Sequence, residues 1–141
     1  MADTLPNRAR VVVIGGGIVG CSVLYHLAKR GWRDVVLVER TELTAGSTWH
    51  AAGNTPHFST SLNLSRIQYA STKLYQALEA ETGQSTGFHQ TGSLRLASLP
   101  DRMDEYRFHA AKAKTIGVPF QLVTPEEIAR LHPLITTEGL L

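Results

Sequence analysis

The clearest hydrophobic pattern in the chain begins at residue 11, where four apolar, β-branched residues run directly into a glycine-rich turn. Apolar residues then recur at helical spacing, and Gly31 precedes a second apolar run. This order predicts a strand at about residues 10–14, a helix at about 18–29 and a second strand at 35–38. We therefore expect an α/β fold that begins with a Rossmann-like βαβ unit.

The pattern changes after this unit. Residues 41–60 are rich in Gly, Ser and Thr, and a loop of that length is usually functional or disordered. Beyond it, the apolar spacing predicts a helix at about residues 64–81, with Gly83 as its stop. The remaining expected elements are a pair of short strand-like pieces within 88–97, a helix at about 100–116, a strand at 118–123 and a helix that starts at Thr124 with a capping box.

The glycine-rich turn has the spacing of a dinucleotide-binding fingerprint. Gly15 would permit the sharp turn out of the strand, Gly17 would let the backbone approach a pyrophosphate, and Gly20 would let the helix lie close to the sheet. The helix N-terminus then presents unpaired N–H groups to the phosphates. Glu39 follows the second strand, where a carboxylate can accept hydrogen bonds from ribose hydroxyls. An ordinary glycine turn before a core helix is the alternative, but the strand, the helix and the acid all agree with the fingerprint.

Composition narrows the class of protein. The 141 residues are 43% hydrophobic and 18% charged, with a net charge of +2, so neither nucleic acid nor an anionic membrane is an expected partner. The only cysteine, Cys21, excludes an internal disulfide and favours a reducing, cytoplasmic location. Arg8 and Arg10 before an apolar run ending at Cys21 resemble a lipoprotein signal, but the glycines would interrupt its apolar segment. No histidine spacing suggests a metal site.

The fingerprint alone leaves the nucleotide open. Glu39 would repel a 2′-phosphate, which disfavours NADP, although the neighbouring Arg40 could accommodate such a group. The choice between NAD and FAD depends on the loop after the second strand. That loop contains the run LTAGSTWHAAG at residues 43–53.

Together with IGGGIVG and VVLVER, this run resembles the dimethylglycine and sarcosine dehydrogenases, in the D-amino-acid-oxidase-like class of FAD-dependent oxidoreductases. The resemblance extends over nearly everything from Arg10 onward. It implies that FAD is the cofactor and that His50 is joined covalently to the 8α-carbon of the flavin, a role that suits a neutral imidazole near pH 7. The cofactor-binding residues that we expect are Gly15, Gly17, Ile18, Val19, Gly20, Glu39, Arg40, Gly46, Ser47, Thr48, Trp49, His50, Ala51, Ala52, Gly53 and Asn54.

The resemblance also implies a reaction. An N-methyl amine such as dimethylglycine or sarcosine would pass a hydride to flavin N5, and water or tetrahydrofolate would take up the one-carbon unit. The sequence after the motif, Asn-Thr-Pro-His at residues 54–57, differs from the continuation typical of the animal enzymes. Two other functions stay open: an amino-acid-oxidase-like flavoprotein related to glycine oxidase with non-covalent FAD, and a non-catalytic dinucleotide-binding remnant or subunit.

The pattern along the chain predicts a boundary, because the turn-rich segment after Gly83 does not continue the βαβ order. The resemblance implies that the domain after this boundary is incomplete. We expect residues 1–9 to form a disordered tail, residues 10–83 the N-terminal part of the FAD-binding domain, and residues 84–141 the start of a truncated α+β substrate domain. The catalytic residues would then lie beyond residue 141. On this reading the chain is the N-terminal piece of a larger enzyme, and it is inactive by itself.

Overall fold

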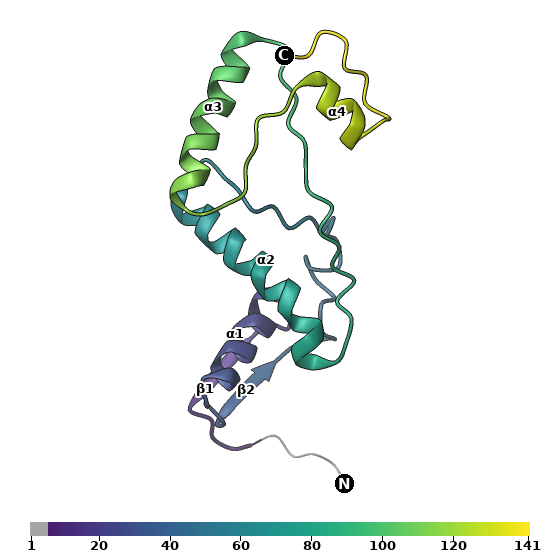
Figure 1. Ribbon diagram of the computed structural model, residues 1–141. Helices are drawn as coiled ribbons and strands as arrows, with labels where there is room; N and C mark the ends of the chain where they lie inside the picture. Colours follow the sequence, from purple (N-terminus) through teal and green to yellow (C-terminus); the bar gives the residue numbers. More distant parts are fainter. Residues whose placement is uncertain (1–5) are drawn as a thin grey trace. The chain divides into compact units, whose positions relative to one another are not determined.

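The computed structural model describes residues 6–141, and the expected tail at residues 1–9 lies mostly outside this range. The described chain forms six elements in the order β1, α1, β2, α2, α3 and α4 (Figure 1). They fall into two compact units, Met1–Asn54 and Thr55–Leu141. The expected start of a substrate domain near Gln84 stays a prediction.

The first unit is a βαβ crossover. Strand β1 (Val11–Ile14) pairs in parallel with β2 (Val35–Val38), so that Val11 faces Val35 and Ile14 faces Val38. Helix α1 (Ile18–Lys29) joins the two strands and lies beside them (Figure 1). These three elements confirm the predicted strand, helix and strand, because the β-branched runs suit a sheet and Gly31, at φ 84°, ends the helical segment.

Helix α1 approaches the turn that follows β1 very closely. A Cβ atom built on Gly20 would lie 1.9 Å from the carbonyl oxygen of Gly15, far inside van der Waals contact. Gly15 itself has φ 100°, a backbone conformation that favours glycine. The two glycines together therefore allow the chain to leave the strand and enter the helix within a few residues.

The second unit contains three helices. Helix α2 (Leu62–Thr82) begins after Ser61, whose hydroxyl accepts from the N–H of Leu64, and ends at Gly83, which has φ 72°. Helix α3 (Pro100–Thr115) starts with proline at its first position, and α4 (Pro125–Leu131) starts with the predicted capping box at Thr124 and Glu127. Among the described residues, no helix is both long and apolar enough to cross a membrane.

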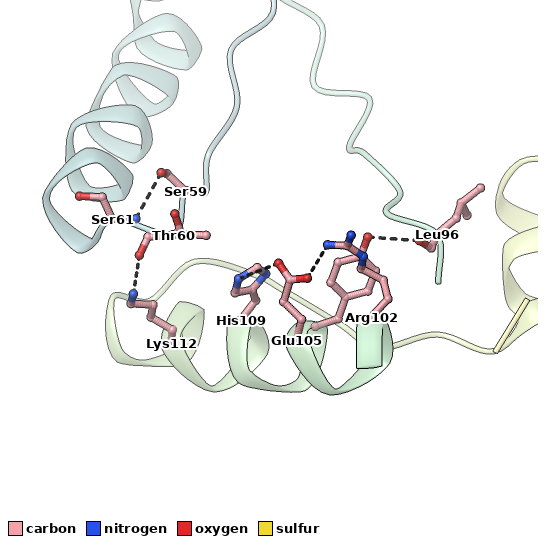
Figure 2. Close-up of polar contacts among 9 residues, drawn as sticks. Ser59, Thr60, Ser61, Leu96, Arg102, Glu105, His109 and Lys112 are labelled. Atoms are coloured by element: carbon pink, nitrogen blue, oxygen red, sulfur yellow. Dashed lines mark hydrogen bonds and ion pairs between the residues drawn. The ribbon is translucent and has the colours of Figure 1, made fainter. Parts of the chain in front are cut away.

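A small core holds the second unit around α3. Phe58, Ala113 and Val118 are buried together, with the partly buried Tyr69, Ile116 and Phe120 packed on them. His109, also buried, lies against the Phe58 ring, with the ring centroids 5.6 Å apart and the ring planes tilted by 57°. Figure 2 shows the polar contacts beside this core, where Lys112 bonds the carbonyl of Thr60 and Glu105 lies between Arg102 and His109.

The strands expected in this unit are absent from the described chain. Residues 88–97 and 118–123 contain no residue assigned to a strand. Alternating apolar residues favour an extended backbone, but a strand also needs a ladder of hydrogen bonds to a second strand. In the described chain, only β1 and β2 form such a ladder. Instead, the N–H of Leu141 donates to the carbonyl of Ala97 at 2.9 Å, and Tyr106 donates to the carbonyl of Leu96 at 3.2 Å.

The close approach at Gly20 generates a first prediction. Gly20→Ala would force its new methyl group onto the Gly15 carbonyl, so we expect a loss of about 3 kcal/mol or more in the free energy of unfolding. Urea denaturation measures this loss. His26→Ala, an exposed change on the same helix, is the matched control and should cost less than about 0.5 kcal/mol. Equal stability of the two variants would contradict this account of the turn.

The capping box generates a second prediction. Thr124 accepts from the N–H of Glu127 at 3.3 Å, and the N–H of Thr124 donates to the Glu127 carboxylate at 2.8 Å. Thr124→Ala removes the first bond and should destabilise α4 by about 1 kcal/mol. Hydrogen exchange of the α4 amides should accelerate accordingly, whereas exposed Thr136→Ala should leave their exchange unchanged.

Candidate functional site: the carboxyl edge of the βαβ unit

The candidate site lies where the two parallel strands end. The glycine-rich turn leaves β1 at Gly15, whose N–H donates to the carbonyl of Val38 at 2.8 Å. Glu39 follows directly after β2, so its side chain lies beside the same turn. Ligands of open parallel sheets bind outside the carboxyl ends of the strands, which is the edge these residues occupy.

Main-chain and side-chain donors hold the Glu39 carboxylate in place. Its Oε2 atom accepts from the N–H of Gly16 at 2.7 Å, and its Oε1 atom accepts from the N–H of Thr41 at 3.1 Å and from the Thr41 hydroxyl at 3.3 Å. The Gly16 hydrogen bond, followed by the bond from Thr41, lowers the pKa of Glu39 from its ordinary value of 4.5. The group therefore stays ionised at neutral pH and keeps lone pairs to accept further hydrogen bonds.

A loop hydroxyl meets the N-terminus of α1. Gly17 is the N-cap residue and makes no side-chain capping bond, while the N–H of Ile18 donates to Thr48 Oγ1 at 3.0 Å. A hydroxyl that accepts this bond can still donate its own proton outward. The helix N-terminus and the Thr48 hydroxyl together therefore present donors that suit an anionic group.

The loop after β2 is tied to the glycine-rich turn at a second point. The N–H of Thr44 donates to the carbonyl of Gly16 at 3.0 Å, and the N–H of Trp49 donates to the carbonyl of Thr44 at 3.1 Å. A Cβ atom on Gly16 would lie 2.6 Å from Leu43 Cδ2, so the loop packs tightly on this glycine. Trp49 is 78% exposed.

His50 is exposed on this loop and has one ring nitrogen engaged. Its Nδ1 atom lies 3.0 Å from the carbonyl oxygen of Gly46. Because a carbonyl oxygen only accepts, Nδ1 must carry the proton in this arrangement. In the neutral ring, Nε2 is then the nitrogen with a free lone pair, which is the atom that could act as a nucleophile.

All of the expected site residues lie in the first unit. Ile18 and Val19 open α1 and are exposed, Arg40 is exposed beside Glu39, and Gly46–Asn54 form the exposed loop in which only Thr48 is partly buried. Three contributors were not expected: Gly16, Thr41 and Thr44. Gly16 is the middle glycine of the GGG run, which was a visible signal, but nothing in the sequence pattern singles out a threonine with φ 68°. Residues 6–141 contain no cluster of three or more metal-ligating side chains.

Comparisons with known proteins agree with this geometry. Dimethylglycine dehydrogenase of Rattus norvegicus, named as mitochondrial, is 52% identical over 135 residues, which is 96% of this chain and 16% of that protein. The pyruvate dehydrogenase phosphatase regulatory subunit of Mus musculus, also named as mitochondrial, is 42% identical over 136 residues, again 96% and 16%. The chain thus spans about a sixth of the length of these curated relatives.

A solved structure and a family model complete the comparison. The crystal structure of L-proline dehydrogenase from P. horikoshii matches with a TM-score of 0.87 and 31% identity, over 97% of this chain and 36% of that one. This match confirms the Rossmann-like α/β fold. The family model of FAD dependent oxidoreductases matches residues 10–141, which confirms the resemblance drawn from the glycine turn and the GSTWHAAG run. The chain belongs to the FAD dependent oxidoreductase family.

Proposed function

We propose that residues 10–54 bind FAD in a flavoprotein that oxidises N-methyl amines of the dimethylglycine or sarcosine type. The observation that carries the proposal is the joining of three features at one edge of the sheet: the free end of α1, the ionised Glu39 and the loop that bears His50. The N–H of Gly16, in the turn that leads into α1, holds Glu39 at 2.7 Å, and the Gly16 carbonyl accepts from Thr44 of the loop at 3.0 Å. The N–H of Ile18, at the start of α1, donates to Thr48 of the same loop at 3.0 Å.

The residues at this edge fit the two halves of FAD. Glu39 has lone pairs for the ribose hydroxyls, and the N-terminus of α1 with the Thr48 hydroxyl has donors for the pyrophosphate. The absence of a side chain at Gly17 leaves room there, since a Cβ atom would come within 3.1 Å of Thr48 Oγ1. The loop from Gly46 to Asn54 would then line the flavin half.

His50 would hold the flavin covalently through Nε2. The hydrogen bond from Nδ1 to Gly46 supports this assignment, because it fixes the tautomer that leaves Nε2 unprotonated and also fixes the orientation of the ring. An electron-withdrawing attachment would make the flavin a stronger oxidant, which suits amine oxidation.

The bound flavin would supply the hydride acceptor for the N-methyl carbon of the amine, and these residues would bind and orient it. Water or tetrahydrofolate would take up the one-carbon unit in the protein at its natural length. The dimethylglycine dehydrogenase relative supports the choice of amine. A cytoplasmic location stays a prediction, while the names of both curated relatives place them in mitochondria.

A second function has a specific observation in its favour. The mouse regulatory subunit shares 42% identity over almost the whole chain, so the same fold also serves a protein whose name denotes regulation. In that case FAD would bind but no amine would reduce it. An oxidase-like protein with non-covalent FAD is the third possibility, and it differs from the first in its amino-acid substrate and in lacking the attachment through His50.

One experiment separates these functions. The protein at its natural length is loaded with FAD and mixed without oxygen with dimethylglycine, sarcosine or glycine, and the absorbance of oxidised flavin is followed. Bleaching by the N-methyl amines alone is the expected result. Bleaching by glycine would favour an amino-acid oxidase, and no bleaching by any amine would favour a regulatory role.

The His50 attachment gives a third prediction. After acid precipitation the wild-type protein should stay yellow, whereas His50→Ala should release all of its flavin to the supernatant. His26→Ala, which removes an exposed histidine of α1, should retain the attached flavin. Free flavin from the wild-type protein would contradict covalent attachment and leave the non-covalent reading.

The lowered pKa of Glu39 gives a fourth prediction. Because the folded-state pKa lies below the ordinary value of 4.5, the stabilisation by Glu39 is fully present above that pH and is lost as the pH falls through the folded-state pKa. The difference in free energy of unfolding between wild type and Glu39→Gln should therefore be larger at about pH 6 than at about pH 3. Glu42→Gln, an exposed change in the same loop, is the control. A pH-independent difference for Glu39→Gln would contradict the hydrogen-bonded carboxylate.

A further inference from the structure

Thr44 has a backbone conformation that is unusual for its residue type. Its φ is 68°, and it is the only non-glycine residue with positive φ in the described chain. A β-branched side chain in the left-handed region is a genuine outlier, and such conformations persist only where the surroundings hold them. The surroundings of Thr44 are therefore expected to supply compensating contacts.

Those contacts come from the glycine-rich turn. The N–H of Thr44 donates to the Gly16 carbonyl at 3.0 Å, and the preceding Leu43 packs on Gly16 so closely that a Cβ atom there would overlap it. The carbonyl of Thr44 accepts from the N–H of Trp49 at 3.1 Å, which starts the tight turns that lead to His50. Thr44 thus links the turn after β1 to the loop that carries His50, through one hydrogen bond to each.

We propose that Thr44 is a positioning residue, whose left-handed backbone sets the loop so that Thr48 and His50 face the flavin. The inference rests on the proposed function, because it assumes that this loop receives the flavin. Thr44 acts through its main-chain N–H and carbonyl, so its side chain need not touch the ligand. Residues that tolerate the left-handed region should replace it, whereas a residue that forbids this conformation should not.

Three substitutions test the proposal. Thr44→Asn keeps the N–H and tolerates positive φ, so FAD affinity should change by less than about 2-fold. Thr44→Val keeps the N–H and the branched shape without the hydroxyl and should behave alike. Thr44→Pro fixes φ near −65° and removes the N–H, so FAD should bind about 10-fold more weakly or worse. AMP, which reports the half held by Glu39, should bind Thr44→Pro as it binds the wild type.

A spectroscopic signature distinguishes positioning from simple support of the fold. The visible circular dichroism of the bound flavin reports its surroundings, and it should change in Thr44→Pro but not in Thr44→Asn. If Thr44→Pro does not fold, Gly16→Ala perturbs the same link from the other side, and Leu43→Ala should partly restore FAD affinity because it removes the overlapping atom. The restoration should be partial, since the new methyl group would also crowd Glu39.

The outcomes separate the two proposals. A wild-type protein that binds AMP but not FAD would overturn the proposed function, and this inference with it. A wild-type protein that binds FAD, with Thr44→Pro equal to it in affinity and spectrum, would overturn the inference alone. Weak FAD binding by both Thr44→Asn and Thr44→Val would also overturn it, because the threonine side chain itself would then be required.

Discussion

The candidate site depends on the main chain of Gly16. Its N–H holds the Glu39 carboxylate at 2.7 Å, and its carbonyl accepts from Thr44 at 3.0 Å. One peptide segment after β1 thus fixes both the acid that follows β2 and the loop beyond that acid. Neither bond needs a side chain at residue 16, and a side chain there would overlap Leu43. A glycine at this position is therefore a requirement of packing.

The same arrangement explains how a short unit can prepare a site for a charged ligand. Hydrogen bonds from the glycine-rich turn and from Thr41 lower the pKa of Glu39, and the same bonds orient its carboxylate. At the N-terminus of α1, which follows the same glycine-rich turn, the helix dipole favours an anion. Acceptors for hydroxyl groups and donors for phosphate oxygens thus lie side by side. They match the ribose hydroxyls, which donate, and the phosphate oxygens, which accept, of a dinucleotide.

Much of this unit could be predicted because its signals are local. Strand, turn, helix and second strand each follow from residue type and spacing, and the capping box at Thr124 needs only four adjacent residues. The prediction of strands at residues 88–97 and 118–123 was wrong. A strand forms only when a second, often distant, segment pairs with it, and an alternating pattern does not show whether such a segment exists. The positive φ of Thr44 could not be predicted either, since threonine avoids this region unless tertiary contacts impose it.

The contrast between Gly20 and Thr44 shows two ways of meeting a steric demand. At Gly20 the residue type itself removes the clash, because any Cβ atom there would lie 1.9 Å from the carbonyl oxygen of Gly15. At Thr44 it is met by contacts, because the residue adopts a costly backbone that Gly16 and Trp49 hold in place. A glycine at residue 44 would adopt that backbone at lower cost but would also leave it more easily. A threonine has fewer backbone conformations to lose on folding than a glycine, so it restricts this loop more narrowly.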